Sequence, residues 1–99
     1  MIVEYLNYKV PVDEQTNFIL DWTNSLEIVQ SSIHCQSTEF EQAIEEPENF
    51  VIRIVWDSVE GHVNGFKKSE SYEKAFEFIK QYSKFINPEI YHYKSVICN

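Results

Sequence analysis

The sequence predicts an α+β fold, with four strands in an antiparallel sheet and two helices on one face of that sheet. Runs rich in β-branched and aromatic residues alternate with two stretches whose apolar residues recur at helical spacing. Their order is β-α-β-β-α-β, the ferredoxin-like arrangement. The chain has 99 residues, enough for one core, so we expect a single domain over 1–99.

The chain begins with a predicted strand followed by a long helix. Residues 2–10 (IVEYLNYKV) are rich in β-branched and aromatic residues and stop at Pro11, as a strand would. Asp13 is a suitable cap for a helix, which we expect over 14–30. The buried face of that helix is marked by apolar residues at helical spacing: Phe18, Trp22, Leu26 and Val29.

Two further strands follow, joined by a turn. Residues 31–44 contain few apolar side chains, so we expect a strand at an edge or beside solvent. The polar segment 45–49 (EEPEN) predicts the turn. Residues 50–56 (FVIRIVW) predict a strand that is covered on both faces. Alternation places Phe50, Ile52, Ile54 and Trp56 on one face, and Val51, Arg53 and Val55 on the other.

The remainder of the chain predicts a short turn, a second helix and a last strand. Asp57 and Glu60 have the spacing of a capping box, which would start a helical turn through His62. Ser69 can cap the second helix. We expect the last strand over 89–97 (EIYHYKSVI). The buried stripe of the second helix would be Tyr72, Ala75, Phe76, Ile79, Tyr82 and Ile86.

The second face of this sheet would be uncovered in a monomer. Its side chains that need shelter from water are Val51, Val55, Tyr91 and Tyr93. We therefore predict a homodimer in which two sheets pack face to face. Arg53 lies on the same face, where we expect it to pair with Glu39 or Glu41; the alternative is an anionic ligand.

Charge and composition exclude several classes of function. The net charge is −8, and residues 1–50 carry ten acidic side chains against Lys9 alone. Such a balance argues against nucleic-acid binding, which needs a clustered basic face. Cys35 and Cys98 are too few for a disulfide framework or a paired-cysteine zinc site. Without a signal sequence or a long apolar run, we expect a cytoplasmic protein that does not enter the membrane.

A family resemblance is carried by three segments: MIVEYLNYKVP (1–11), PENFVIRIVWDSVEGHVNGFKKS (47–69) and SYEKAFEFIKQY (71–82). Together they resemble the antibiotic biosynthesis monooxygenase family, whose members are dimeric α+β barrels of about this length. The middle segment is the most specific, and it is similar to a bacterial subgroup that occurs attached to or near truncated globins. The resemblance thus implies a homodimer and, for that subgroup, a globin as a candidate partner.

The same resemblance implies cofactor-independent oxygenation of electron-rich phenols, hydroquinones or anthrones. Such a substrate, once deprotonated, can itself donate an electron to oxygen, so the protein need only bind, orient and shield it. No metal, flavin or haem would be required. Some relatives degrade haem with a histidine ligand and a tryptophan, but those positions fall on Ala75 and Gly65 here. The asparagine that the haem enzymes carry on the first strand falls near Glu4 instead of Asn7, so we disfavour haem degradation.

His62 is the candidate catalytic residue, since an imidazole has a suitable pKa for proton abstraction near neutrality. Trp56 and Phe66 are the candidate walls of an aromatic pocket, although both would also serve as core residues. Further candidate contacts to a ligand are Tyr5, Asn7 and His34, for each of which ordinary packing is the alternative.

A second hypothesis is a non-catalytic module that binds a small molecule or works beside a globin. Other members of the family carry a histidine nine residues after the tryptophan that ends the central strand, and that position is Gly65 here. The polar segment 36–38 also departs from the pattern of the globin-associated subgroup. An open cavity within reach of His62 would favour an enzyme, whereas a space filled by aromatic rings would favour the module.

Overall fold

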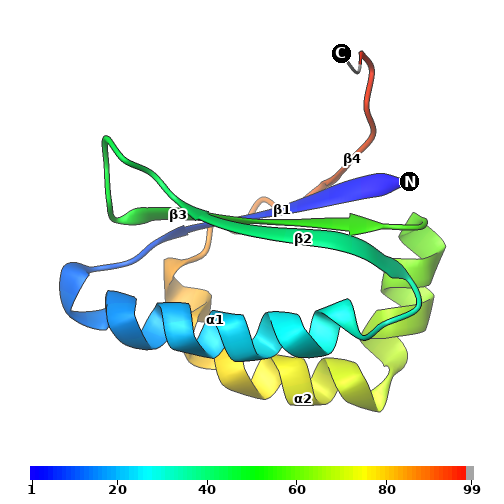
Figure 1. Cartoon of the computed structure of the whole chain (residues 1–99), viewed down its shortest axis with the longest axis horizontal. Helices are drawn as coiled ribbons and strands as arrows, with labels where there is room; N and C mark the ends of the chain where they lie inside the picture. The colour runs from blue at the N-terminus through cyan, green and yellow to red at the C-terminus, as the bar shows by residue number, and fades with distance from the viewer. Residues whose placement is uncertain (98–99) are drawn as a thin grey trace.

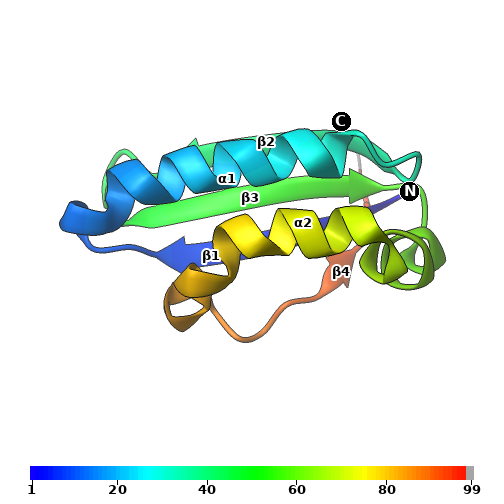
Figure 2. The ribbon, with the colours of Figure 1, turned by 90° about the horizontal axis from the view of Figure 1, so that it is seen from below.

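The computed structural model describes residues 1–97 and confirms the α+β, ferredoxin-like fold. The sheet has the strand order β2-β3-β1-β4, and its strand pairs are antiparallel. Helices α1 and α2 lie side by side on one face of it (Figure 1; Figure 2). The elements are β1 (Ile2–Lys9), η1 (Val12–Glu14), α1 (Gln15–Gln30), β2 (Cys35–Gln42), β3 (Asn49–Trp56), η2 (Gly61–Gly65), η3 (Phe66–Lys68), α2 (Glu70–Ile79), η4 (Lys80–Phe85) and β4 (His92–Tyr93).

The hydrophobic core lies between the helices and the sheet. Strand β3 buries one face as predicted, with Phe50, Ile52, Ile54 and Trp56 each at most 3% exposed. Phe18 of α1 stands at the centre of an aromatic cluster and packs edge-on against Tyr8 and Tyr82, with ring centroids 4.9 Å and 5.1 Å away. Edge-to-face pairs of this kind stabilise beyond the area that they bury.

The last strand is much shorter than predicted. We expected strand structure over 89–97, but β4 comprises only His92–Tyr93, which pair with Glu4 and Val3. Upstream, the chain is held to β1 by one hydrogen bond, from Asn87 N to Asn7 O at 2.8 Å. Pro88 follows directly and has no N–H to continue a ladder, so the chain leaves the sheet there. Beyond β4, residues 94–97 extend away from the sheet, on the side opposite the two helices (Figure 1).

Two predicted helix caps are wrong. Asp13 lies inside the 3₁₀ turn η1, and the side chain of neither Pro11 nor Glu14 caps the helical segments that follow them. At the turn after β3, the backbone N–H of Gly61 donates to Ser58 Oγ (2.9 Å), so Ser58 takes the capping role that we gave Asp57. The Asp57 carboxylate is instead bound to His34. The Ser69 cap is confirmed, since its hydroxyl accepts from Tyr72 N.

The second helix is continuous only to Ile79, where we expected it to reach Ile86. Residues Lys80–Phe85 adopt the tighter 3₁₀ form η4. Within it the Ser83 hydroxyl donates to the Lys80 carbonyl (2.9 Å), a local contact that competes with regular helical bonding. Tyr82 nevertheless remains buried, as the predicted stripe required.

The open face of the sheet carries a polar pair and a tyrosine pair. Arg53 Nη1 donates to Glu39 Oε1 at 2.9 Å, which confirms one of the two partners expected for Arg53. Tyr5 packs edge-on against Tyr93, with ring centroids 5.4 Å apart. No helix among residues 1–97 is long and apolar enough to cross a membrane.

Candidate functional site

A cavity of about 370 Å³ lies between the sheet and the helices α1 and α2. Its walls are mostly aromatic and aliphatic, and they include Trp22, Trp56, Phe66, Tyr72 and Phe76. These rings line the space and do not fill it. A largely apolar cavity with a few polar groups is the usual form of a small-molecule site.

The polar groups gather at one end of this cavity. Trp56 Nε1 donates to Glu4 Oε1 at 3.1 Å, and His62 Nε2 lies 3.6 Å from the same oxygen. His62 Nδ1 in turn lies 2.7 Å from His92 Nε2, within hydrogen-bond distance. The His62 ring stacks on the Trp56 indole, with centroids 4.3 Å apart and an interplanar angle of 12°. We call Glu4, Trp56, His62 and His92 the polar cluster.

Three segments bring the polar cluster together. Glu4 lies on the inner face of β1, directly opposite His92 in the β1–β4 pairing. Trp56 ends β3 on the same inner face. His62 comes from η2, a π-helical turn that begins five residues after Trp56. Turns of this kind widen the helix locally and occur often at functional sites.

Burial controls the charge of the polar cluster. Glu4 is 9% exposed, and burial raises the pKa of its carboxyl, an effect partly offset by the Trp56 hydrogen bond and the positive charge of Lys67. Burial lowers the pKa of His62 to about 4, with further lowering by His92 and Lys67. Burial and Lys67 also lower the pKa of His92. Both imidazoles are therefore neutral at neutral pH, and each can donate one hydrogen bond and accept another.

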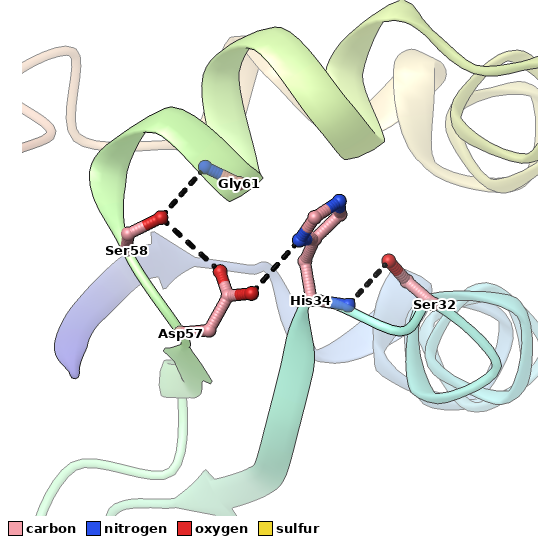
Figure 3. Close-up of polar contacts among 5 residues, drawn as sticks. All are labelled: Ser32, His34, Asp57, Ser58 and Gly61. Atoms are coloured by element: carbon pink, nitrogen blue, oxygen red, sulfur yellow. Dashed lines mark hydrogen bonds and ion pairs between the residues drawn. The ribbon is translucent and has the colours of Figure 1, made fainter.

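A second histidine–carboxylate pair lies outside the cavity, on the other side of η2. His34 Nδ1 lies 2.8 Å from Asp57 Oδ2, and Ser58 Oγ donates to Asp57 Oδ1 at 3.3 Å. Figure 3 shows the His34 ring directed at the Asp57 carboxylate, below the turn that carries Gly61. The main chain joins the same two residues, since Asp57 N donates to His34 O at 2.8 Å. The pair thus ties the start of β2 to the end of β3.

The two glycines of η2 are explained by this pair. A Cβ at Gly65 would lie 2.6 Å from His34 Nε2, and a Cβ at Gly61 would lie 2.7 Å from His34 Nδ1. The His34 ring therefore packs directly on the backbone of η2, which only glycine permits at both positions. This contact fixes the turn that carries His62 on its other side.

The structure brings three of the six predicted site residues together. His62, Trp56 and Phe66 all line the cavity, and the Phe66 ring packs 5.2 Å from Trp56. Tyr5 and Asn7 do not line it: Tyr5 pairs with Tyr93, and Asn7 is exposed on β1. His34 is likewise absent from the lining. The roles proposed for these six residues stay predictions.

Sequence reasoning missed Glu4 and His92 as site residues. A signal for Glu4 was present, because the inner-face positions of β1 read Ile2, Glu4, Leu6 and Tyr8, so that a single acid interrupts an apolar row. A charge at such a position needs partners. His92 had no comparable signal, since its place depends on a two-residue strand pairing. Within residues 1–97, no three His, Cys, Asp or Glu side chains are grouped so that they could hold a metal ion.

Solved structures with the same fold share low sequence identity with this chain. One is a candidate antibiotic biosynthesis monooxygenase from Bordetella bronchiseptica, with a TM-score of 0.81, 15% identity and 97% coverage of both chains. Another structure, also described as a candidate antibiotic biosynthesis monooxygenase, is from Deinococcus radiodurans. It has a TM-score of 0.76 and 12% identity, and the match covers 100% of this chain and 96% of that chain. A third, from Chloroflexus aurantiacus, has a TM-score of 0.68 and 20% identity, and the match covers 100% of this chain and 97% of that chain.

No family model and no curated protein matches the sequence. The fold is thus the one found in structures described as antibiotic biosynthesis monooxygenases, which confirms the expected resemblance at the level of the fold. At these identities the likeness extends to architecture alone.

Proposed function

We propose that this protein is a cofactor-independent monooxygenase that acts on a small aromatic, hydroquinone or related electron-rich metabolite. The observation that carries the proposal is the aromatic-walled cavity of about 370 Å³ with the polar cluster at one end. Trp56 and Phe66 would hold the ring of the substrate. The polar cluster around His62 would accept a proton from its hydroxyl group.

The chemistry needs little from the protein beyond binding, proton removal and shielding. The deprotonated substrate gives one electron to O₂, and the substrate radical and superoxide then combine to a peroxide. The peroxide anion takes back the proton that the polar cluster had removed, and loss of water from the resulting hydroperoxide leaves a quinone. An apolar cavity supports these steps because it holds the reactive intermediates away from bulk water.

Oxygen consumption tests this proposal. Uptake with a panel of hydroquinones and anthrones should exceed the uncatalysed rate, and the corresponding methyl ethers, which have no hydroxyl proton, should give none. His62→Gln should lower the rate, whereas Glu73→Gln, on the exposed surface of α2, should not. Uptake at the background rate with every compound would contradict the proposal and leave a binding module as the function of the cavity.

We also propose that two copies pair through the open faces of their sheets. Support comes from the aromatic and apolar groups exposed there and on the adjoining tail: Tyr91 at 59%, Tyr93 at 49%, Val96 at 88% and Ile97 at 79%. Covering such groups stabilises an association. A cytoplasmic location is part of the same proposal and suits the free thiol of Cys35. Sedimentation of a monomer at micromolar concentration would contradict the dimer.

A further inference from the structure

The Glu4 side chain lines the polar end of the cavity, and one of its two carboxylate oxygens is without a hydrogen-bond partner among the described residues. Its Oε1 atom accepts from Trp56 Nε1 and faces His62 Nε2. Its Oε2 atom has no hydrogen-bond partner among residues 1–97, and the side chain lines the cavity. A ligand hydroxyl at this end could therefore donate to Glu4 without displacing any contact within the protein.

His62 has no such free atom. Its Nδ1 is engaged with His92 Nε2, its Nε2 faces Glu4 Oε1, and one ring face is covered by Trp56. At 4% exposure the residue is enclosed by these three contacts. A ligand could reach a nitrogen of His62 only by breaking the chain that runs from Glu4 to His92.

We propose that Glu4, and not His62, takes the hydroxyl proton of a phenolic ligand in this cavity and holds it while the ligand is a phenolate. This inference rests on the proposed function, of which it specifies the ligand class and the proton acceptor. The ligand is a hydroxyaromatic compound that binds as a neutral phenol.

The proton transfer conserves charge inside the cavity. The phenol O–H bond breaks, its proton forms an O–H bond on the Glu4 carboxylate, and the negative charge passes to the phenolate oxygen. One buried anion is replaced by another, so no additional charge is desolvated. Transfer to His62 would instead add two buried charges, an imidazolium and a phenolate, to the Glu4 carboxylate already there.

The proton stays on Glu4 for as long as the ligand is a phenolate. Its release to water would leave two anions, the Glu4 carboxylate and the phenolate, together in one largely apolar cavity.

The charged and titratable groups around Glu4 support this assignment. They are His62 from η2, His92 from β4, Lys67 from η3 and Tyr8 from β1. Burial raises the pKa of Glu4 towards that of a phenol, about 10, and lowers the pKa of His62 to about 4, away from it. Lys67 provides a positive charge that attracts the phenolate as it forms.

Anaerobic binding of substituted nitrophenols tests the proton acceptor, because phenol and phenolate absorb at different wavelengths. If the proton stays within the site, the phenolate fraction of the bound probe should not change with bulk pH near neutrality. In Glu4→Gln, whose amide oxygen can still accept from Trp56, the proton must go to water, so the ratio of bound phenolate to bound phenol should rise about tenfold per pH unit. His62→Gln should keep the pH-independent behaviour.

Two results would overturn the inference: a wild-type phenolate fraction that follows bulk pH, or pH dependence that appears in His62→Gln and not in Glu4→Gln. Nitroanisoles, which have no proton to lose, should bind wild type and Glu4→Gln within about twofold and so report an intact cavity. The oxygen assay separates the two proposals. Absence of oxygen uptake with a pH-independent bound phenolate would refute the oxygenase and leave the Glu4 assignment standing.

Discussion

Two histidine–carboxylate pairs lie on opposite sides of η2, and they show how burial decides what such a pair does. The side chains of His34 and Asp57 are 30% and 40% exposed, whereas those of His62 and Glu4 are 6% and 11% exposed. The exposed pair lies 2.8 Å apart and the buried pair 3.6 Å apart. The pKa of the Asp57 carboxyl is lowered from its ordinary value, whereas the pKa of the Glu4 carboxyl is raised.

In the exposed pair, His34 holds the pKa of Asp57 below its ordinary value, mainly through their hydrogen bond. In the buried pair, loss of water raises the pKa of Glu4 and outweighs the hydrogen bond from Trp56. The exposed histidine–carboxylate contact stabilises a carboxylate, whereas burial of the second pair raises the pKa of its carboxyl group and lowers the pKa of its imidazole.

The largest effect is expected on stability in acid. His62 has a pKa of about 4 in the folded protein against 6.5 in the unfolded chain. Below pH 6.5 the unfolded chain binds the proton first, so His62 removes stability as the pH falls towards 4, by about 3 kcal/mol. Urea unfolding across this range should show a steeper loss for wild type than for His62→Gln.

Glu4 acts in the opposite direction in the same experiment. Its raised pKa means that the folded protein takes up the proton first as the pH falls, which adds stability at low pH. Because both proteins contain Glu4, its contribution largely cancels in their difference. Parallel pH curves for wild type and His62→Gln would show that His62 is not held neutral by the fold.

The sequence predicted the fold and half of the site for a clear physical reason. Alternation in FVIRIVW and the helical spacing of Phe18 and Trp22 are local patterns, and they determine which faces are buried. The polar cluster depends on contacts that are not local: Glu4 meets Trp56 across 52 positions, and His62 meets His92 across 30. Among these contacts, only those of Glu4 could have been expected from the sequence, because this acid interrupts the apolar row of β1.

The same limit applies to the exposed pair. Asp57 and Glu60 have the spacing of a capping box, and that local pattern led to the wrong cap. The preferred partner of Asp57 is His34, which lies 23 positions earlier and is brought close by the pairing of β2 with β3. Likewise β4 pairs with β1 only at Val3 and Glu4, although residues 89–97 are rich in side chains that favour strands.

Trp56→Phe would separate the hydrogen bond of the buried cluster from its packing. The phenyl ring keeps most of the apolar surface but leaves Glu4 Oε1 without its donor at 3.1 Å, so we expect a loss of about 2 kcal/mol in stability. The pKa of Glu4 should rise further, because the Trp56 hydrogen bond lowers it in the wild type. Carbon-detected NMR titration of Glu4 would measure that rise, and an unchanged or lower pKa would contradict it.

Gly65→Ala tests the contact by which the exposed pair supports η2. The new Cβ would lie 2.6 Å from the His34 ring, and such crowding costs about 1 to 3 kcal/mol. The better helical propensity of alanine offsets about 1 kcal/mol of this, so the net loss should be about 1 kcal/mol. In the background of His34→Ala the same substitution should be neutral or stabilising. Equal effects in both backgrounds would show that His34 is not the obstacle.

Asp57→Asn should have the smallest effect, because the carboxylate is solvated and asparagine can still accept from His34 Nδ1. The lowered pKa of Asp57 means that the charged carboxylate adds stability above its ordinary value of 3.8, and that this contribution is lost as the pH falls through its folded-state pKa. Thermal unfolding of wild type and variant should therefore differ slightly at neutral pH and converge in acid. A difference in stability that grew in acid would show that the pKa of Asp57 is raised, like that of Glu4. The contrast between the two sides of η2 would then be wrong.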